Sequence, residues 1–295
     1  MPSIRVEHDL NSADRAAVDD LLDAATKVTG EPPLSDHLRL DLQAGGAPGF
    51  TAALAGDGAL DAYAQVSAAH ESASVELVVH PDAAAREDEL SVELLRAVRA
   101  AVDGPLYWWV HGVTPAHDRI ATSVGMSSER RLLQLRRALP TGLDAGIDTR
   151  PFVPGQDEAA WLEVNNRAFA WHPEQGGWDI ATLHAREAEP WFDPAGFLLH
   201  ERAGRLAAFC WTKLHPATAV DPELGEIYVI AVDPDFTGLG LGKALTLAGL
   251  ASIAERGVTT GMLFVDESNT TAVGLYERLG FTTHRVDVAY LSPHR

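Results

Sequence analysis

Cysteine is almost absent from this chain: Cys210 is the only one among 295 residues. A single cysteine excludes an internal disulfide framework and fits a reducing compartment, so we expect a cytoplasmic protein. Basic residues are also scarce, with 23 Lys and Arg against 42 Asp and Glu and a net charge of −19. Because so acidic a chain repels phosphate backbones, we expect no nucleic-acid partner.

Long apolar runs and metal-binding spacings are missing too. No stretch approaches the ~18 apolar residues of a membrane span. Residues 1–20 lack the basic start and apolar segment of a signal peptide. We therefore expect no membrane partner. The 12 histidines show no ligand spacing such as H-E-x-x-H, so no metal is expected either.

The chain does contain the same predicted order of helices and strands twice. Its length favours two domains, and residues 139–157, rich in Pro, Gly and Asp, predict a linker. When Pro81 is aligned with Pro234, VELVVHPD (75–82) lies over YVIAVDPD (228–235). Around both runs the order is helix, hairpin, strand, turn, helix, strand, helix, strand. The sequence predicts an α+β fold with two tandem domains, 1–142 and 148–295, and we expect a monomer.

The turn that follows the second strand is rich in glycine. VDPDFTGLGLGKAL (232–245) places Gly238, Gly240 and Gly242 between an apolar strand and a helical run. A helix start is electropositive and attracts anions, and glycines let a phosphate approach the backbone. The spacing is neither G-x-G-x-x-G nor a P-loop, since Ala follows Lys243. By itself the pattern fits either a phosphate-binding loop or a ligand-free turn.

Two signatures together point to a family. The turn resembles the acyl-CoA signature [QR]-x-x-G-x-[GA] of the GCN5-related N-acetyltransferases (GNAT), with Thr237 in place of the usual Gln or Arg. NTTAVGLYERLGF (269–281) resembles their second signature, N-x-x-A-x-x-x-Y-x-x-x-G-F. Further segments resemble the mycothiol synthase family within it: NRAFAWHPEQGGW (166–178), WFDPAGFLL (191–199), FCWTKLHP (209–216) and GEIYVIAVDP (225–234).

The resemblance implies a fold and a reaction. Each half would be a GNAT-type domain, a mixed, mostly antiparallel sheet flanked by helices. The enzyme would acetylate the cysteine amine of cysteinyl-glucosaminyl-inositol with acetyl-CoA, as the final step of mycothiol biosynthesis. Two alternatives stay open: a tandem acetyltransferase acting on another small amine, such as an aminoglycoside or amino acid, and a non-catalytic acyl-CoA-binding module.

The resemblance also implies site residues. Glu226 would be the general base and Tyr276 the acid that protonates the CoA thiolate. From sequence alone, Glu226 could also be an exposed strand-edge glutamate, and a packing role is the commoner one for a tyrosine such as Tyr276. Strand alternation would put Glu226 on one face with Tyr228 and Ile230. Acetyl-CoA would contact, in the second half, Ile230, Ala231, Val232, Thr237, Gly238, Leu239, Gly240, Leu241, Gly242, Lys243, Asn269, Thr270, Thr271, Ala272, Val273 and Gly274. Substrate would contact Asp36, Glu174, Lys213, Glu226 and Phe264; the family usually has Glu at Asp36 and Tyr at Phe264.

The first half has lost these features. Glu87 and Glu89 fall where Gly240 and Gly242 stand, and alanines fall where Glu226 and Tyr276 stand. Acidic residues at a helix start repel pyrophosphate, so we expect a single active site, in the second half, with the first half as scaffold and partial wall of the substrate cleft. For the apolar strand Leu77, Val78 and Val79 we expect weak acetyl-CoA binding or none. Cys210 is expected to be a buried strand residue, because no His–Asp pair accompanies it.

Overall fold

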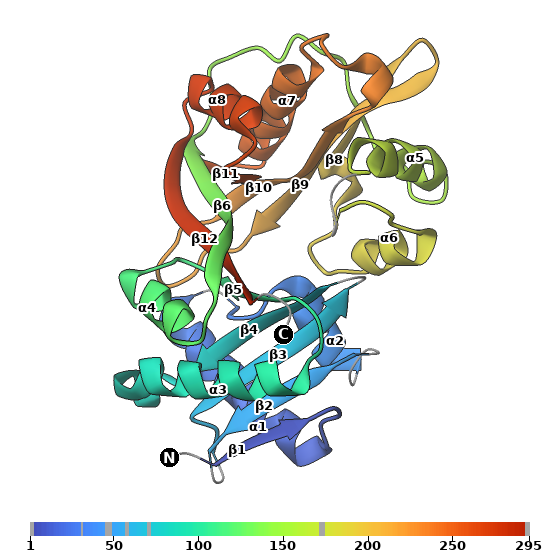
Figure 1. Cartoon of the computed structure of the whole chain (residues 1–295). Coiled ribbons are helices and arrows are strands. Elements are labelled where there is room, and N and C mark those ends of the chain that lie inside the picture. Colours follow the sequence, from blue (N-terminus) through green and yellow to red (C-terminus); the bar gives the residue numbers. More distant parts are fainter. Residues whose placement is uncertain are drawn as a thin grey trace. The chain divides into compact units, whose positions relative to one another are not determined.

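The computed structural model describes residues 3–30, 32–44, 49–56, 59–69, 72–170 and 175–292. Two compact units make up the chain (Figure 1). The first contains Met1–Leu132, Asp266–Ser268 and Arg285–Arg295, and the second contains Leu133–Val265 and Asn269–His284.

The first unit has a mixed sheet with helices on both faces. Its strands lie in the order β1 (Ile4–Glu7), β2 (Thr51–Ala55), β3 (Ala62–Ala69), β4 (Ser72–Val79), β5 (Leu106–Val110) and the end of β12 (Thr282–Ser292). Only β4 and β5 are parallel among these neighbours. Its helices are α1 (Ser12–Thr29), α2 (Asp36–Ala44), the 3-10 turn η1 (Pro81–Arg86), α3 (Glu87–Ala101) and α4 (Pro115–Ser123).

Strand alternation divides the core of this unit into two layers. Leu54 and Tyr63 face one way and pack with Val18 of α1 and Leu38 of α2. The intervening small residues, such as Ala53 and Ala64, face the other way and pack under Leu90, Leu94 and Val98 of α3. Small side chains on this face let α3 lie close to the sheet.

The second unit repeats the arrangement. Its strands lie in the order β6 (Ser127–Ala138), β11 (Thr260–Asp266), β10 (Leu224–Val232), β9 (Arg205–His215), β8 (Phe197–Arg202) and β7 (Arg150–Pro151). Its helices are α5 (Glu158–Ala168), α6 (Ile180–Glu187), η2 (Pro194–Gly196), η3 (Pro234–Phe236), α7 (Leu241–Glu255) and α8 (Thr270–Arg278). The pair β10 and β11 is parallel, as β4 and β5 are.

The two faces of the second sheet are packed differently. On one, α7 approaches so closely that a Cβ added at Gly249 would meet Cys210 Sγ at 2.5 Å and Ile227 Cδ1 at 2.6 Å. On the other, an aromatic cluster fills the space below α5 and α6. Phe197 and Trp211 stack with centroids 4.4 Å apart, and Trp161 meets Trp211 edge-on at 5.9 Å. Offset and edge-on rings of this kind stabilise a core beyond their buried area.

The structure confirms the α+β class and the repeated order of elements. The series β4, η1, α3, β5, α4 matches β10, η3, α7, β11, α8, with 15 residues in both long helices and nine in both short ones. The compact units nevertheless differ from the ranges 1–142 and 148–295. Residues 133–138 of β6 belong to the second unit, while the chain from Arg285 onward belongs to the first, where β12 pairs with β5. Strand pairing, not position along the chain, decides this membership, and the two sequence ranges stay a prediction.

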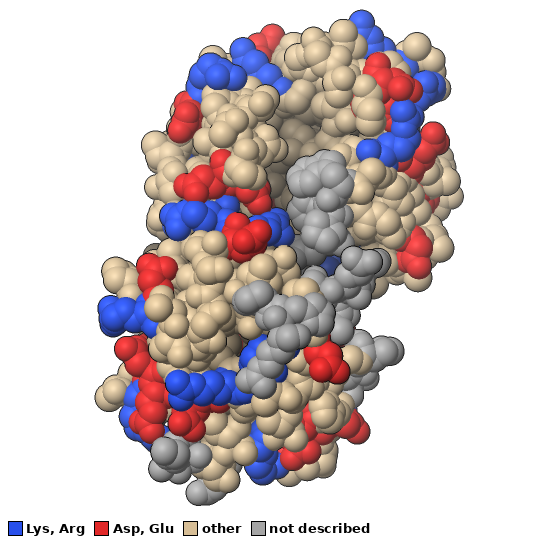
Figure 2. Space-filling view, viewed as in Figure 1, with Lys and Arg blue, Asp and Glu red and all other residues tan. Residues whose placement is uncertain are grey.

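Among the described helices, none combines the length and apolarity that crossing a bilayer requires. Charge is mixed on the face seen in Figure 2, where Lys and Arg side chains stand among Asp and Glu.

Candidate functional site

The glycine turn joins β10 to α7. Gly238 and Gly240 have φ angles of +77° and +76°, in the left-handed region where glycine is favoured, and Gly240 forms the N-cap of α7. A Cβ built at either position would meet no atom within 4 Å, so packing does not explain these glycines. No side chain of the described residues caps the helix, and its first turn holds no acidic residue. The start of α7 can therefore present free backbone N–H groups to an anion.

The equivalent helix of the first unit begins with the opposite charge. The first turn of α3 holds Glu87, Asp88 and Glu89. Arg86 pairs with Glu89 at 3.4 Å and with Asp61 at 3.2 Å. These carboxylates already complement the positive helix end, so this turn is unsuited to a pyrophosphate.

The central strand separates from its parallel neighbour just before the glycine turn. The pairing of β10 with β11 ends at Ile227 and Leu263, whereas β10 continues along β9 as far as Val232. Backbone groups of Ile230, Ala231 and Val232 on the β11 side thus have no ladder partner from that strand. Such a gap offers N–H and C=O groups to an extended amide-containing ligand.

A β-bulge corrects one expectation about faces. The β9–β10 register shifts between Ile227 and Val229, so β10 carries one extra residue there. Tyr228 lies on the aromatic face, with its ring 5.1 Å from Trp191. Ile230 pairs with Cys210, on the α7 face. The expectation that Ile230 shares a face with Glu226 is therefore wrong, because strict alternation breaks at the bulge.

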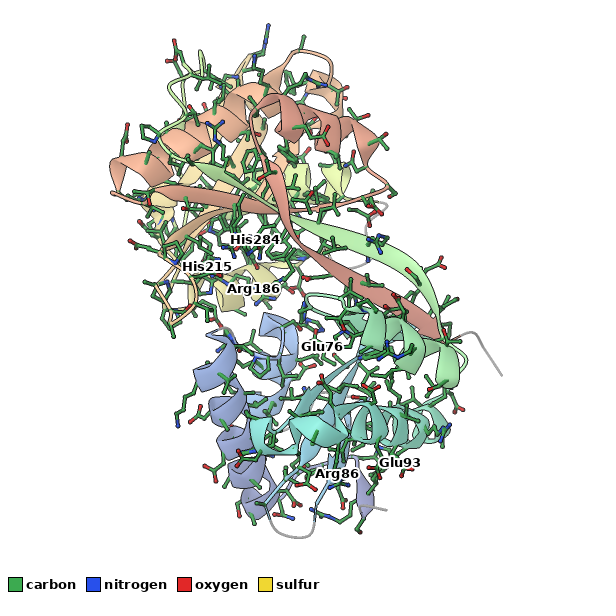
Figure 3. The ribbon with its side chains drawn as sticks, turned by 90° about the vertical axis from the view of Figure 1, so that its left-hand side faces the viewer. Glu76, Arg86, Glu93, Arg186, His215 and His284 are labelled. Carbon is green, nitrogen blue, oxygen red and sulfur yellow. The ribbon has the colours of Figure 1, made fainter. Side chains whose placement is uncertain are left out.

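Glu226 lies in the sheet interior rather than at an exposed edge. Its side chain is largely buried, at 7% residue exposure, and its Oε2 lies 2.7 Å from Nε2 of His215. Figure 3 shows His215 among the side chains of this unit. Lys213 stands directly across from Glu226, and its Nζ lies 4.6 Å from the ring centroid of Trp191 and 5.4 Å from that of Tyr228. The site thus combines a buried carboxylate, an imidazole and a cation against aromatic rings.

Sequence reasoning missed His215 and Trp191. It placed Tyr228 on the face of Glu226, as the structure does, but gave it no role in the site. His215 lies two residues after Lys213 on one strand, and that spacing alone could have placed it on the same face. Which residue of the next strand it meets depends on register, which the local pattern does not reveal.

Tyr276 lies on α8 with 8% exposure, and its ring meets Phe281 edge-on at 5.7 Å. Burial raises its pKa to about 12, helped by the neighbouring Cys210. The phenol is therefore protonated at neutral pH and can act as a proton donor. Cys210 itself is completely buried in β9, as expected, and burial raises the pKa of its thiol to about 12. A neutral, inaccessible thiol is no nucleophile.

The structure places the other expected residues as follows. Thr237 Oγ1 donates to the Pro234 carbonyl at 3.0 Å, so the hydroxyl already serves the turn. Asn269 caps α8 by accepting from the Ala272 N–H at 3.1 Å, and Thr270 to Gly274 form the start of that helix. Leu239 and Lys243 are exposed, Leu241 is buried, and Phe264 lies half-buried in β11. Glu174 lies outside the described residues, as does the side chain of Asp36, whose backbone begins α2.

One group of side chains could hold a cation. Glu158, His184 and Glu187, on α5 and α6, each offer a ligand atom, and these atoms lie within 4.8 Å of one another. Helix packing brings them together without any sequence spacing that signals a metal site. None of the three belongs to the expected site.

In the first unit, charged side chains lie next to the point where the equivalent strands part. The pairing of β4 with β5 ends at Val75 and Trp108, and the next residue, Glu76, is buried and accepts from the Ser35 N–H at 2.7 Å. His111 lies 3.7 Å from Glu76 and 3.2 Å from Asp287. Beyond this gap, Val78 packs with the α1 core, while Leu77 and Val79 pack partly buried on the α3 side. An ion cluster thus lies beside the strand gap of the first unit, and the position aligned with Glu226 holds Ala73 instead of a carboxylate.

Protonation of His111 is expected to stabilise the fold. Burial alone would lower the pKa of His111, but the hydrogen bond with Asp287 and the Glu76 carboxylate 3.7 Å away outweigh it and raise the pKa to about 10. Because this lies above the ordinary 6.5, the stabilisation is complete below about pH 6.5 and is lost as the pH rises to about 10. Urea unfolding of wild type and His111→Gln should differ most near pH 6 and converge toward pH 10. Equal differences at every pH would contradict this assignment.

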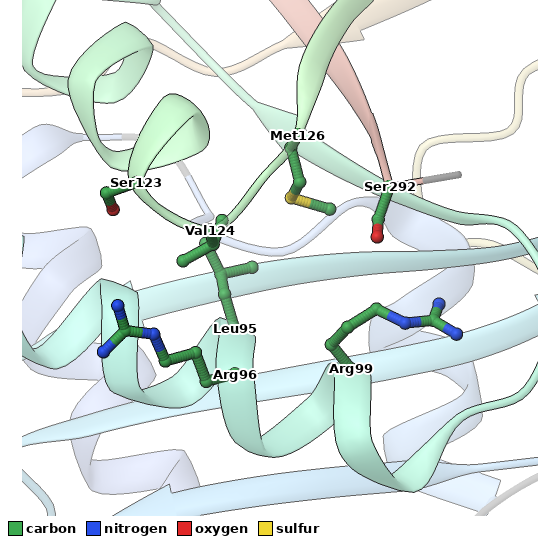
Figure 4. Close-up of a pocket in the computed structure, with 7 residues that line it drawn as sticks. All are labelled: Leu95, Arg96, Arg99, Ser123, Val124, Met126 and Ser292. Carbon is green, nitrogen blue, oxygen red and sulfur yellow. The ribbon is translucent and has the colours of Figure 1, made fainter. Parts of the chain in front are cut away.

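The first unit also has a pocket. It is lined by two arginines of α3 and by apolar and small residues: Leu95, Arg96, Arg99, Ser123, Val124, Met126 and Ser292 (Figure 4). It contains none of the expected site residues. Arg99 Nη1 donates to the Gly104 carbonyl at 2.7 Å and so supports the loop before β5.

The sequence of this chain is similar to those of known acetyltransferases. Residues 161–281 match the model of the acetyltransferase (GNAT) family. The mycothiol acetyltransferase of Thermomonospora curvata is 48% identical over 281 residues, which cover 92% of each chain. That of Thermobispora bispora is 47% identical over 297 residues, covering 98% of this chain and 99% of its own.

Solved structures share the fold over almost the full length. A GCN5-related N-acetyltransferase from Sphaerobacter thermophilus gives a TM-score of 0.68 at 24% identity, covering 98% of this chain and 95% of its own. A tandem GNAT protein from the clavulanic acid biosynthesis pathway gives 0.67 at 17% identity, covering 99% and 98%. With relatives this similar over nearly all of their length, the chain belongs to the mycothiol acetyltransferase family of GNAT enzymes.

Proposed function

We propose that this enzyme transfers the acetyl group of acetyl-CoA to the cysteine amine of cysteinyl-glucosaminyl-inositol, the final step of mycothiol biosynthesis. The observation that carries the proposal is the buried Glu226 carboxylate, which lies where β10 begins to part from β11. The names of the similar relatives support the choice of substrate.

Acetyl-CoA binds the second unit in this proposal. Its pyrophosphate lies against the backbone N–H groups from Thr237 to Lys243, at the uncapped start of α7. The pantetheine arm lies along Ile230 to Val232, beside the gap between β10 and β11, and forms hydrogen bonds with their backbone. The start of α8, Asn269 to Gly274, completes the site. No metal takes part.

Few groups are needed for the reaction. The substrate ammonium has a reference pKa of about 7.7–8.0, and Glu226 takes its proton directly or through one water. The amine nitrogen then forms a bond to the thioester carbonyl carbon, and a backbone N–H of β10 stabilises the oxyanion. When the tetrahedral intermediate collapses, the C–S bond breaks with its electron pair on sulfur. In the same collapse the nitrogen releases its second proton to solvent, and Tyr276 donates its proton to the thiolate and regains one from solvent.

The substrate carries hydroxyl groups and a cysteinyl amine, so it needs polar partners more than apolar area. Lys213, held above Trp191 and Tyr228, and Glu226 supply such partners in the second unit. Phe264 contributes an apolar ring without the hydroxyl usual in the family. Asp36 and Glu174 stay predicted substrate contacts.

The first unit is structural in this proposal. The acidic start of α3 and the Glu76–His111 pair support this reading. Calorimetry should then give one acetyl-CoA per chain, and two sites of similar affinity would contradict it. We also propose that the protein is cytoplasmic and monomeric. Sedimentation can test the monomeric state.

The substrate is tested by measuring CoA release with cysteinyl-glucosaminyl-inositol and with a panel of aminoglycosides and amino acids. We expect kcat/KM for the first to exceed that of every panel member by at least about 10²-fold, because a site built for hydroxyl groups rejects ligands that leave its polar groups unpaired. A preferred panel amine would indicate a different GNAT substrate. Binding of acetyl-CoA without CoA release on any amine would indicate a non-catalytic binding module.

A further inference from the structure

The contact that the proposed reaction leaves unused is the one between His215 and Glu226. His215 ends β9 and pairs with Leu224, whereas Glu226 pairs with Lys213. The two side chains are therefore diagonal neighbours on one face, a separation that long side chains can bridge. Their atoms Nε2 and Oε2 lie 2.7 Å apart.

We infer that His215 is a positioning residue that orients the Glu226 carboxylate toward the substrate amine. This inference rests on the proposed role of Glu226. An ionised carboxylate can only accept hydrogen bonds. The N–H group at Nε2 of His215 therefore donates the hydrogen bond, and Oε2 of Glu226 accepts it. Within the described part of the chain, His215 is the one hydrogen-bond partner of that carboxylate. Oε2 is held in place, and Oε1 is left to take the proton.

Burial makes this single hydrogen bond important. Glu226 is 7% exposed, whereas the His215 side chain is 32% exposed. A buried carboxylate with one partner has few other means of fixing its plane, and a charge-assisted hydrogen bond is about twice as strong as a neutral one. Because the imidazole extends from a strand rather than a loop, its own position is well defined. Positioning errors of about 1 Å near reacting atoms can cost about 10²-fold in rate.

Two substitutions separate positioning from simple packing. His215→Leu removes the donor, and we expect kcat to fall by about 10- to 100-fold with KM for acetyl-CoA within about twofold. His215→Gln can place an amide N–H near the site of Nε2, so it should recover most of the lost kcat. His200→Leu is the matched control, because His200 lies on β8 and its Nδ1 lies 2.9 Å from the Asp148 carbonyl rather than near Glu226. It should leave kcat unchanged.

A double-mutant cycle shows whether His215 acts through Glu226. We expect His215→Leu to cost less than about twofold when Glu226→Gln is already present, because residues that act as a unit are not additive. The inference is overturned if His215→Gln is as slow as His215→Leu, or if His215→Leu costs the same factor in both backgrounds. Full activity of Glu226→Gln alone would instead overturn the proposed base, a result distinct from failure of the positioning role.

Discussion

Glu226→Gln is expected to lower kcat by about 10²- to 10⁴-fold, the usual contribution of a general base, while the dissociation constant of acetyl-CoA stays within about twofold. The reason is that Gln cannot accept the substrate proton. Its amide oxygen can still accept the hydrogen bond that His215 Nε2 donates over 2.7 Å. The fold and the acetyl-CoA site should therefore persist, and the loss should lie in the chemical step.

Steady-state CoA release and calorimetry measure these two quantities. Glu223→Gln is a matched control, since Glu223 is exposed and lies three residues before Glu226. It removes the same charge from the same segment and should leave kcat unchanged. If both variants turn over like wild type, Glu226 is not the base.

Tyr276→Phe should have the next largest effect, with kcat lower by about 10²-fold or more, as expected on loss of a general acid. Burial raises the pKa of Tyr276 to about 12, so the native side chain carries the proton that the departing thiolate needs. Phenylalanine keeps the edge-on packing on Phe281, 5.7 Å away, and removes only the hydroxyl. Stability and acetyl-CoA affinity should therefore change little.

This variant can be compared with Tyr107→Phe, on β5 of the first unit, which should leave kcat intact. CoA release is measured for both, together with thermal unfolding to detect any loss of fold. Wild-type turnover in Tyr276→Phe would assign protonation of the thiolate to water or to another group. Wild-type turnover in both Glu226→Gln and Tyr276→Phe would mean that the reaction centre lies elsewhere.

Local patterns in the sequence were sufficient for the elements that carry the proposed site. Apolar periodicity and the glycines predicted a strand, a turn and a long helix, and the structure has β10, a turn with left-handed Gly238 and Gly240, and α7. The sequence also predicted a buried Cys210, because no His–Asp pair accompanies it, and the structure confirms the burial. These features depend on residues close together in the chain, so their physical cause can be read from composition and spacing.

Contacts between distant segments required the tertiary structure. The bulge at Tyr228 adds one residue to β10 and turns Ile230 to the α7 face, which no alternating pattern shows. Register places His215 beside Glu226, and pairing of β12 with β5 brings Asp287 to His111, 176 residues away in the chain. The sequence by itself determined the order of elements, the family resemblance and the candidate base and acid. Strand register, which depends on the packing of the whole sheet, decided which side chains surround them.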